Sequence, residues 1–170
     1  FISNGESMAE KHWQILQNIC PRAKRVDGVD GRDIAYKTAA RLSDTDWFYA
    51  VFAKTEVLPT FKFDFVADRL QEPKHYIFYS RNALNGLDYG SMNIDLYNKQ
   101  LVLDTHIEDG SMLDFTLSKK HTVVPEVASI AQFNTDPWVT WRSAYREVIK
   151  LKQEVDNGAG IEIRHRLDTW

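Results

Sequence analysis

The chain contains one cysteine, Cys20, among its 170 residues. A single thiol can form neither an intramolecular disulfide nor a metal site built from several cysteines. No apolar run approaches the roughly 18 residues that a membrane span requires, and no signal peptide precedes the first apolar segment. These absences predict a cytoplasmic protein without a membrane partner.

The chain also has little excess charge of either sign, because 21 basic residues and 24 acidic residues leave a net charge of −3. This balance provides no long-range attraction to duplex nucleic acid, although a local patch could still hold one. Phosphate-binding glycine motifs and a nucleophile elbow are missing as well. None of the five histidines has metal-ligand spacing: His12, His75, His106, His121 and His165.

The composition is that of one globular domain, with 44% hydrophobic and 12% aromatic residues. A length of 170 residues agrees with a single domain over residues 1–170. Phe1 falls within an apparent strand and Trp170 within an apparent helix. We therefore expect a domain excised from, or a fragment of, a longer chain.

Strand and helix patterns alternate through the first 55 residues. A strand over residues 1–4 leads into a helix whose Ser7 and Glu10 have the spacing of a capping box. A strand near residues 24–27, a helix over 33–42 and a strand over 46–53 follow, and the last is apolar without alternation. Such a strand is typical of a parallel sheet covered on both faces. The pattern predicts a doubly wound α/β half with its ligand site at the carboxyl ends of the strands.

The second half mixes short strands with helices. Alternating phenylalanines predict a half-exposed strand over residues 61–65, and four more short strands are predicted over 75–79, 90–96, 100–104 and 121–124. Asp136 as N-cap, followed by Pro137, predicts a helix that runs to about residue 152. Its Trp138 and Trp141 are predicted to be core residues, and a last helix is predicted over 161–170.

Several blocks of the sequence resemble a group of glycosyltransferase-like proteins common in tailed bacteriophages. The blocks occur in the same order in that group and cover residues 24–40, 44–49, 80–90, 131–137 and 140–147. The resemblance implies a fold of the glycosyltransferase GT-A type. That fold would be α/β, with a Rossmann-like, mixed but mainly parallel sheet flanked by helices.

The resemblance also implies an Asp-x-Asp motif at a strand end, where the carboxylates hold Mg²⁺ or Mn²⁺ against the diphosphate of a nucleotide sugar. A divalent ion would neutralise the charge that grows on the leaving diphosphate. The matching positions here read Phe52-Ala53-Lys54, followed by Thr55-Glu56. Both carboxylates are replaced, so a metal cofactor is doubtful, and Glu56 alone could hold Mg²⁺ only with help from substrate phosphates.

Four residues are candidates for binding the donor: Asp27, Arg32, Lys54 and Glu56. Asp27 and Arg32 bracket a strand end and a helix start, where backbone N–H groups can meet an anion. The ammonium of Lys54 could replace the metal as a phosphate clamp. The alternatives are an ordinary Asp/Gly turn and a solvated lysine.

The remaining candidates would face the acceptor: Arg81, Asn82, Asn85, Tyr89, Arg142 and Arg146. The first four lie in a polar, turn-rich segment whose aromatic ring is expected to be exposed and able to stack on a sugar or base, unless the segment is only a structural turn. The two arginines could grip a diphosphate or belong to a solvated helix face. Asp136 is the candidate catalytic base, although its role as a helix cap explains it equally.

The sequence thus predicts transfer of a sugar from a nucleotide sugar to an unknown acceptor, namely a DNA base, a glycan or a protein. The alternative is a non-catalytic binding module, which the missing carboxylates favour. A third alternative is another chemistry on the same fold.

Overall fold

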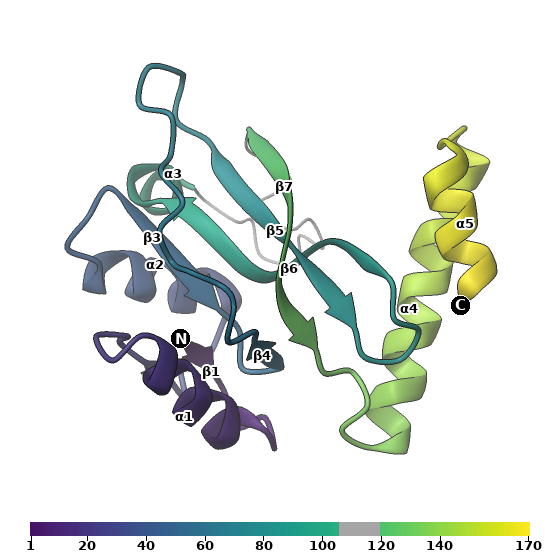
Figure 1. Cartoon of the computed structure of the whole chain (residues 1–170), viewed down its shortest axis with the longest axis horizontal. Coiled ribbons are helices and arrows are strands. Elements are labelled where there is room, and N and C mark those ends of the chain that lie inside the picture. The colour runs from purple at the N-terminus through teal and green to yellow at the C-terminus, as the bar shows by residue number, and fades with distance from the viewer. Residues whose placement is uncertain (106–119) are drawn as a thin grey trace.

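The computed structural model describes residues 1–105 and 120–170. The predicted helices and most of the predicted strands are present (Figure 1). Along the chain the elements are β1 (Ile2–Ser3), α1 (Ala9–Ile19), β2 (Val26–Asp27), α2 (Arg32–Leu42), β3 (Trp47–Val51), β4 (Thr55–Val57), β5 (His75–Asn82), β6 (Asp88–Asn98), α3 (Lys99–Asp104), β7 (His121–Ala131), α4 (Pro137–Asp156) and α5 (Ile161–Thr169). His106 lies outside the described residues.

The first half has the predicted strand–helix alternation. β1 and β2 pair in parallel, and a parallel bridge from Ile2 to Phe52 places the end of β3 beside β1. Leu16 of α1 packs with Val51, whereas Tyr36 of α2 packs with Ala50. Because neighbouring residues of a strand point to opposite faces, β3 is covered by α1 on one face and by α2 on the other, as predicted.

The main sheet is not the mainly parallel, Rossmann-like GT-A sheet that the sequence led us to expect. Its strand order is β3-β6-β5-β7-β4, and only β5 and β7 run parallel within it, while the other three pairs are antiparallel. The five residues between β5 and β6 are too few for a crossover, so these two strands form a hairpin. An apolar strand such as β3 suits either direction of pairing, which is why the prediction of a parallel sheet was wrong.

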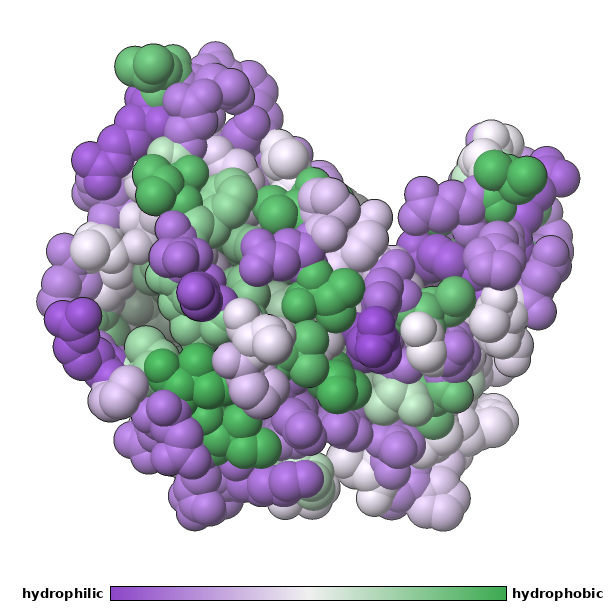
Figure 2. All heavy atoms as spheres, in the orientation of Figure 1, coloured by the Kyte–Doolittle hydropathy of each residue, from purple (hydrophilic) through white to green (hydrophobic). Residues whose placement is uncertain are grey.

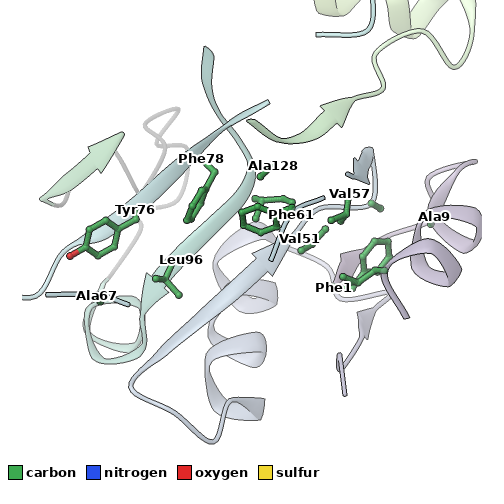
Figure 3. Close-up of a cluster of buried hydrophobic side chains, with 13 residues drawn as sticks. Phe1, Ala9, Val51, Val57, Phe61, Ala67, Tyr76, Phe78, Leu96 and Ala128 are labelled. Carbon is green, nitrogen blue, oxygen red and sulfur yellow. The ribbon is translucent and has the colours of Figure 1, made fainter. Parts of the chain in front are cut away.

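An aromatic cluster fills the core between the sheet and the segment that follows β4 (Figure 3). The Phe61 and Phe78 rings lie 5.2 Å apart and Phe61 is buried. Residues 61–65 form no strand, because their phenylalanines pack as an irregular segment and the Phe65 N–H donates to the Tyr49 hydroxyl. Burial raises the pKa of Tyr49 to about 12.

Two further local predictions were wrong. Residues 100–104 belong to helix α3, because the Asn98 side chain caps it by accepting from the Leu101 N–H. Ser7 does not cap α1, whose N-cap is Met8. The Glu10 carboxylate binds Arg25 rather than reaching back to the helix start.

Helices α4 and α5 form an arm beside the sheet, separated from it by a notch at one end (Figure 2). Asp136 caps α4 as predicted, accepting from the Val139 N–H at 2.9 Å, and Pro137 is its first residue. Trp138 and Trp141 are 63% and 55% exposed, so their predicted place in the core was wrong. They stack on each other, with 5.2 Å between ring centroids. Within the described ranges, no helix has both the length and the apolar character needed to cross a bilayer.

Candidate functional site

The carboxyl ends of β1 and β2 carry a hydrogen-bonded polar cluster. The Ser3 hydroxyl and the Arg25 guanidinium both donate to the Asp27 carboxylate, the latter at 3.2 Å. Arg25 also donates to Glu10 of α1 at 2.8 Å. The hydrogen bond from Ser3, aided by Arg25, holds the pKa of Asp27 below its usual range. Asp27 is thus an ionised, exposed acceptor at a strand end.

The turn after β2 exposes backbone at the same edge. Gly28 and Gly31 have φ values of 67° and 87°, in the left-handed region that favours glycine. Arg32 follows as the first residue of α2 and is exposed. The structure therefore places Asp27 and Arg32 on the two sides of one short turn, as the sequence predicted.

A second polar cluster surrounds Glu56 on β4. His12 is fully buried, and its Nδ1 lies 2.6 Å from the Ala53 carbonyl oxygen. The Glu56 Oε2 accepts from the Gln132 amide at 3.2 Å and lies 3.8 Å from the Lys11 ammonium. Because α1 contributes Glu10 to the first cluster and His12 to the second, the two clusters are neighbours.

Lys54 does not point into an open pocket beside Arg32. Its ammonium lies 4.8 Å from the centre of the Phe133 ring. Burial lowers the pKa of Lys54, and the carboxylate of Glu147 on α4 partly offsets this effect. The side chain is therefore directed toward the arm rather than toward Asp27.

No group of three or more potential metal ligands occurs among residues 1–105 and 120–170. The letters of the expected acidic motif do occur at Asp44-Thr45-Asp46, which lies before β3 rather than after it. Asp44 is paired there with the Lys24 ammonium at 2.8 Å. The position at which the resemblance led us to expect the metal carries Lys54.

The segment between β5 and β6 is a self-contained turn. Arg81 donates twice to Asp88, each time at 2.9 Å, and the Asn82 amide donates to the Tyr89 hydroxyl at 3.0 Å. The Asn85 side-chain oxygen accepts from the Leu87 N–H. These contacts favour the structural interpretation of the turn.

Tyr89 is only 5% exposed, so the expectation of an exposed ring at this position was wrong. Arg166 of α5 covers the ring and donates to Glu147 of α4 at 2.8 Å. Burial raises the pKa of the Tyr89 phenol. The ring face that was predicted to stack on a ligand is therefore occupied by the protein itself.

The residues predicted on α4 lie apart from the strand-end clusters. Asp136 is exposed and engaged as the helix cap. Arg142 and Arg146 are exposed next to the stacked aromatic rings of the same helix. Among the described residues, no hydrogen bond or ion pair joins Asp136 to Asp27 or Glu56, and each of the three has other partners.

A cavity of about 510 Å³ opens near the amino end of β3. Its lining is largely apolar and includes Leu16, Trp47, Phe63 and Leu96, with Lys24 and Asp44 among its charged residues. None of the predicted site residues lines it. We place the candidate site at the strand ends, because the ionised and hydrogen-bonding side chains gather there.

Sequence reasoning missed six residues of the two clusters: Ser3, Glu10, Lys11, His12, Arg25 and Gln132. Because Glu10 was interpreted as part of a capping box, its hydrogen bond with Arg25 was not predicted. The alternation of Arg25 and Asp27 along one strand could have placed both on the same face. No family model, no curated protein and no solved structure matches the chain.

Proposed function

We propose that the chain binds the nucleotide of a nucleotide-sugar donor at the carboxyl ends of β1, β2 and β3, and transfers the sugar to an acceptor. The observation that carries this proposal is Asp27, an ionised carboxylate at the end of β2 and beside Ser3 of the parallel strand β1. In βαβ nucleotide sites a carboxylate in this position accepts hydrogen bonds from the ribose hydroxyls. The start of α2, which follows the Gly28–Gly31 turn, supplies backbone N–H groups for the phosphates.

The leaving diphosphate needs a positive charge, and Lys54 stands at the strand end where paired aspartates would otherwise hold a metal. An ammonium with a lowered pKa still binds phosphate as a cation at neutral pH, because a bound dianion restores the charged form. To reach the phosphate, the Lys54 side chain must leave the Phe133 ring. The proposal is therefore transfer that does not depend on a divalent metal.

The second candidate is a non-catalytic nucleotide-binding module. The engagement of Lys54 with Phe133 favours it, as does the engagement of Asp136 as a helix cap. Both residues predicted for the chemistry have structural partners. This candidate shares the donor site and lacks the transfer step.

Thermal unfolding with UDP, GDP, CDP and their sugars, each with Mn²⁺ and with EDTA, tests the proposal. A ligand at 100 times its Kd stabilises a protein by about 2.7 kcal/mol, so a bound donor gives a clear rise in Tm. We expect a rise with one nucleoside diphosphate that EDTA leaves unchanged. The absence of a rise with every donor would refute both candidates, whereas binding without release of the diphosphate would leave the binding module.

A further inference from the structure

His12 combines complete burial with an unsatisfied ring nitrogen. The Ala53 carbonyl oxygen can only accept, so the Nδ1 that lies 2.6 Å from it carries a proton and donates. In the neutral imidazole the lone pair is then on Nε2. Among the described residues, Nε2 has no hydrogen-bond partner, although it is buried.

The Glu56 carboxylate faces this nitrogen. Its Oε2 lies 3.9 Å from Nε2, and no donor of the described chain lies between them. A lone pair and a carboxylate oxygen in this arrangement hold no proton, and a buried acceptor without a donor is costly. One added proton converts the two acceptors into an N–H···O or O–H···N hydrogen bond after a small rotation of Glu56.

Charged and polar neighbours hold Glu56 in place and leave part of its side chain exposed to solvent. Lys11 is the charged group of α1 that faces the carboxylate, at 3.8 Å, and the neutral Gln132 donates to it from the end of β7. The Glu56 side chain is 30% exposed, whereas His12 is not exposed at all. Glu56 is therefore the member of the pair that solvent or a substrate can reach.

We propose that His12 and Glu56 form a proton-accepting pair in which Glu56 is the base for the acceptor hydroxyl, an assignment that rests on the proposed sugar transfer. The acceptor O–H proton passes to a Glu56 oxygen, and the electron pair stays on the acceptor oxygen. That oxygen bonds to the anomeric carbon as the bond to the diphosphate oxygen breaks, and the diphosphate leaves with the electron pair. The transferred proton is then shared between Oε2 and Nε2.

The pair lies next to the donor cluster. The Ala53 N–H donates to the Ile2 carbonyl at 3.0 Å, and Ser3 is the next residue of β1. His12 holds the carbonyl of that same Ala53. His12 is accordingly a positioning residue for Glu56, and Glu56 replaces Asp136 as the proposed base.

The test is a titration of the ¹⁵N-labelled full chain by NMR, following the two ring nitrogens of His12 in the wild type and in Glu56→Gln. Gln keeps the shape of the side chain and removes its charge. Glu126→Gln is the matched control, because Glu126 is an exposed carboxylate of β7, the strand that pairs with β4. We expect Nδ1 to carry the proton of the neutral ring in all three proteins, and the ¹⁵N chemical shift of Nε2 to change in Glu56→Gln but not in Glu126→Gln.

An unchanged Nε2 signal in Glu56→Gln, or a proton on Nε2 in the neutral ring, would overturn the pair. If Glu56→Gln does not fold, the wild type alone decides, because its neutral His12 must then carry the proton on Nδ1 and the lone pair on Nε2. A proton on Nε2 would overturn the proposal. If the His12 signal responds to Glu56→Gln but the chain binds no donor, the sugar transfer and the role of Glu56 as its base are refuted. If the chain binds a donor but the His12 signal does not respond, only the pair is refuted.

Discussion

The guanidinium carbon of Arg166 lies 3.9 Å from the centre of the Tyr89 ring, so a residue of the last helix covers a strand of the main sheet. The same guanidinium donates to Glu147, and both side chains of this ion pair are mostly buried. Arg166 thus ties α5 to α4 and both helices to β6. These contacts hold the arm, which Figure 2 shows beside the sheet, against β6.

Arg166→Met should loosen the arm. The variant keeps an apolar stem but removes the cation over the ring and leaves Glu147 without its partner, which we expect to lower the free energy of unfolding by about 1–3 kcal/mol. Urea denaturation measures the loss, and proteolysis in residues 156–160 reports release of α5. Arg164→Met, an exposed neighbour on the same helix, is the control. Equal stability of the two variants would contradict this role.

Asp27→Asn should weaken nucleotide binding about tenfold or more, because the amide offers one acceptor oxygen in place of two. Isothermal titration calorimetry measures the change. Asp30→Asn, in the same exposed turn, is the control and should bind like the wild type. A tenfold loss in both variants would point to the charge of the turn rather than to Asp27.

The difference in stability between the wild type and Asp27→Asn should also depend on pH. The depressed pKa of Asp27 means that the ionised form stabilises the folded state, and this contribution is present above the unfolded pKa of about 3.9 and is lost as the pH falls through the folded value. The difference in Tm between the wild type and Asp27→Asn should therefore shrink below about pH 4. A constant difference down to the acid limit would contradict the hydrogen bond from Ser3.

Lys54→Met should raise stability at neutral pH and weaken donor binding. Burial lowers the pKa of Lys54, so the folded state binds its proton less well than the unfolded state, and wild-type stability rises with pH between the folded value and the ordinary value near 10.4. Met removes the buried charge, with an expected gain of about 1 kcal/mol at pH 7. The Tm of the wild type, measured from pH 7 to 10, should approach the Tm of Lys54→Met only near pH 10. Lys62→Met, at an exposed position, should have neither effect.

Replacing Trp138 and Trp141 together by Gln should leave the free energy of unfolding within about 0.5 kcal/mol of the wild type, because both rings are more than half exposed. The same variant should lose most of the fluorescence that acrylamide quenches. Trp13→Gln, which removes a ring packed on Phe1, should cost more stability and leave that quenching in place. A large loss of stability in the double variant would restore the core interpretation of these two residues.

The successful predictions of the fold depended on residues that are close together in the sequence. Asp136 and Pro137 mark the start of α4 because an N-cap acts within one turn of its own helix. The direction of the main sheet could not be predicted in this way, because the pairing of β3 with β6 joins residues such as Trp47 and Asn98. An apolar strand satisfies a parallel and an antiparallel neighbour equally well.

The candidate site was predictable in part for the same reason. Asp27 and Arg32 lie at the ends of one short turn, which the sequence shows directly. The cluster around Glu56 joins residues that are far apart in the chain, since Gln132 is 76 positions away. The exposure of Tyr89 likewise depends on Arg166, a residue of the last helix.

Ala131 pairs with Thr55 on one side and with Asn82 on the other, so β4 has its place in the main sheet only through β7. β4 is three residues long, and a strand of this length is not stable without its neighbour. During synthesis the Glu56 segment must therefore wait, without its partner strand, until residues 129–131 have been made. The base that we propose at Glu56 is thus completed late in folding, and a chain that ends before β7 should lack it.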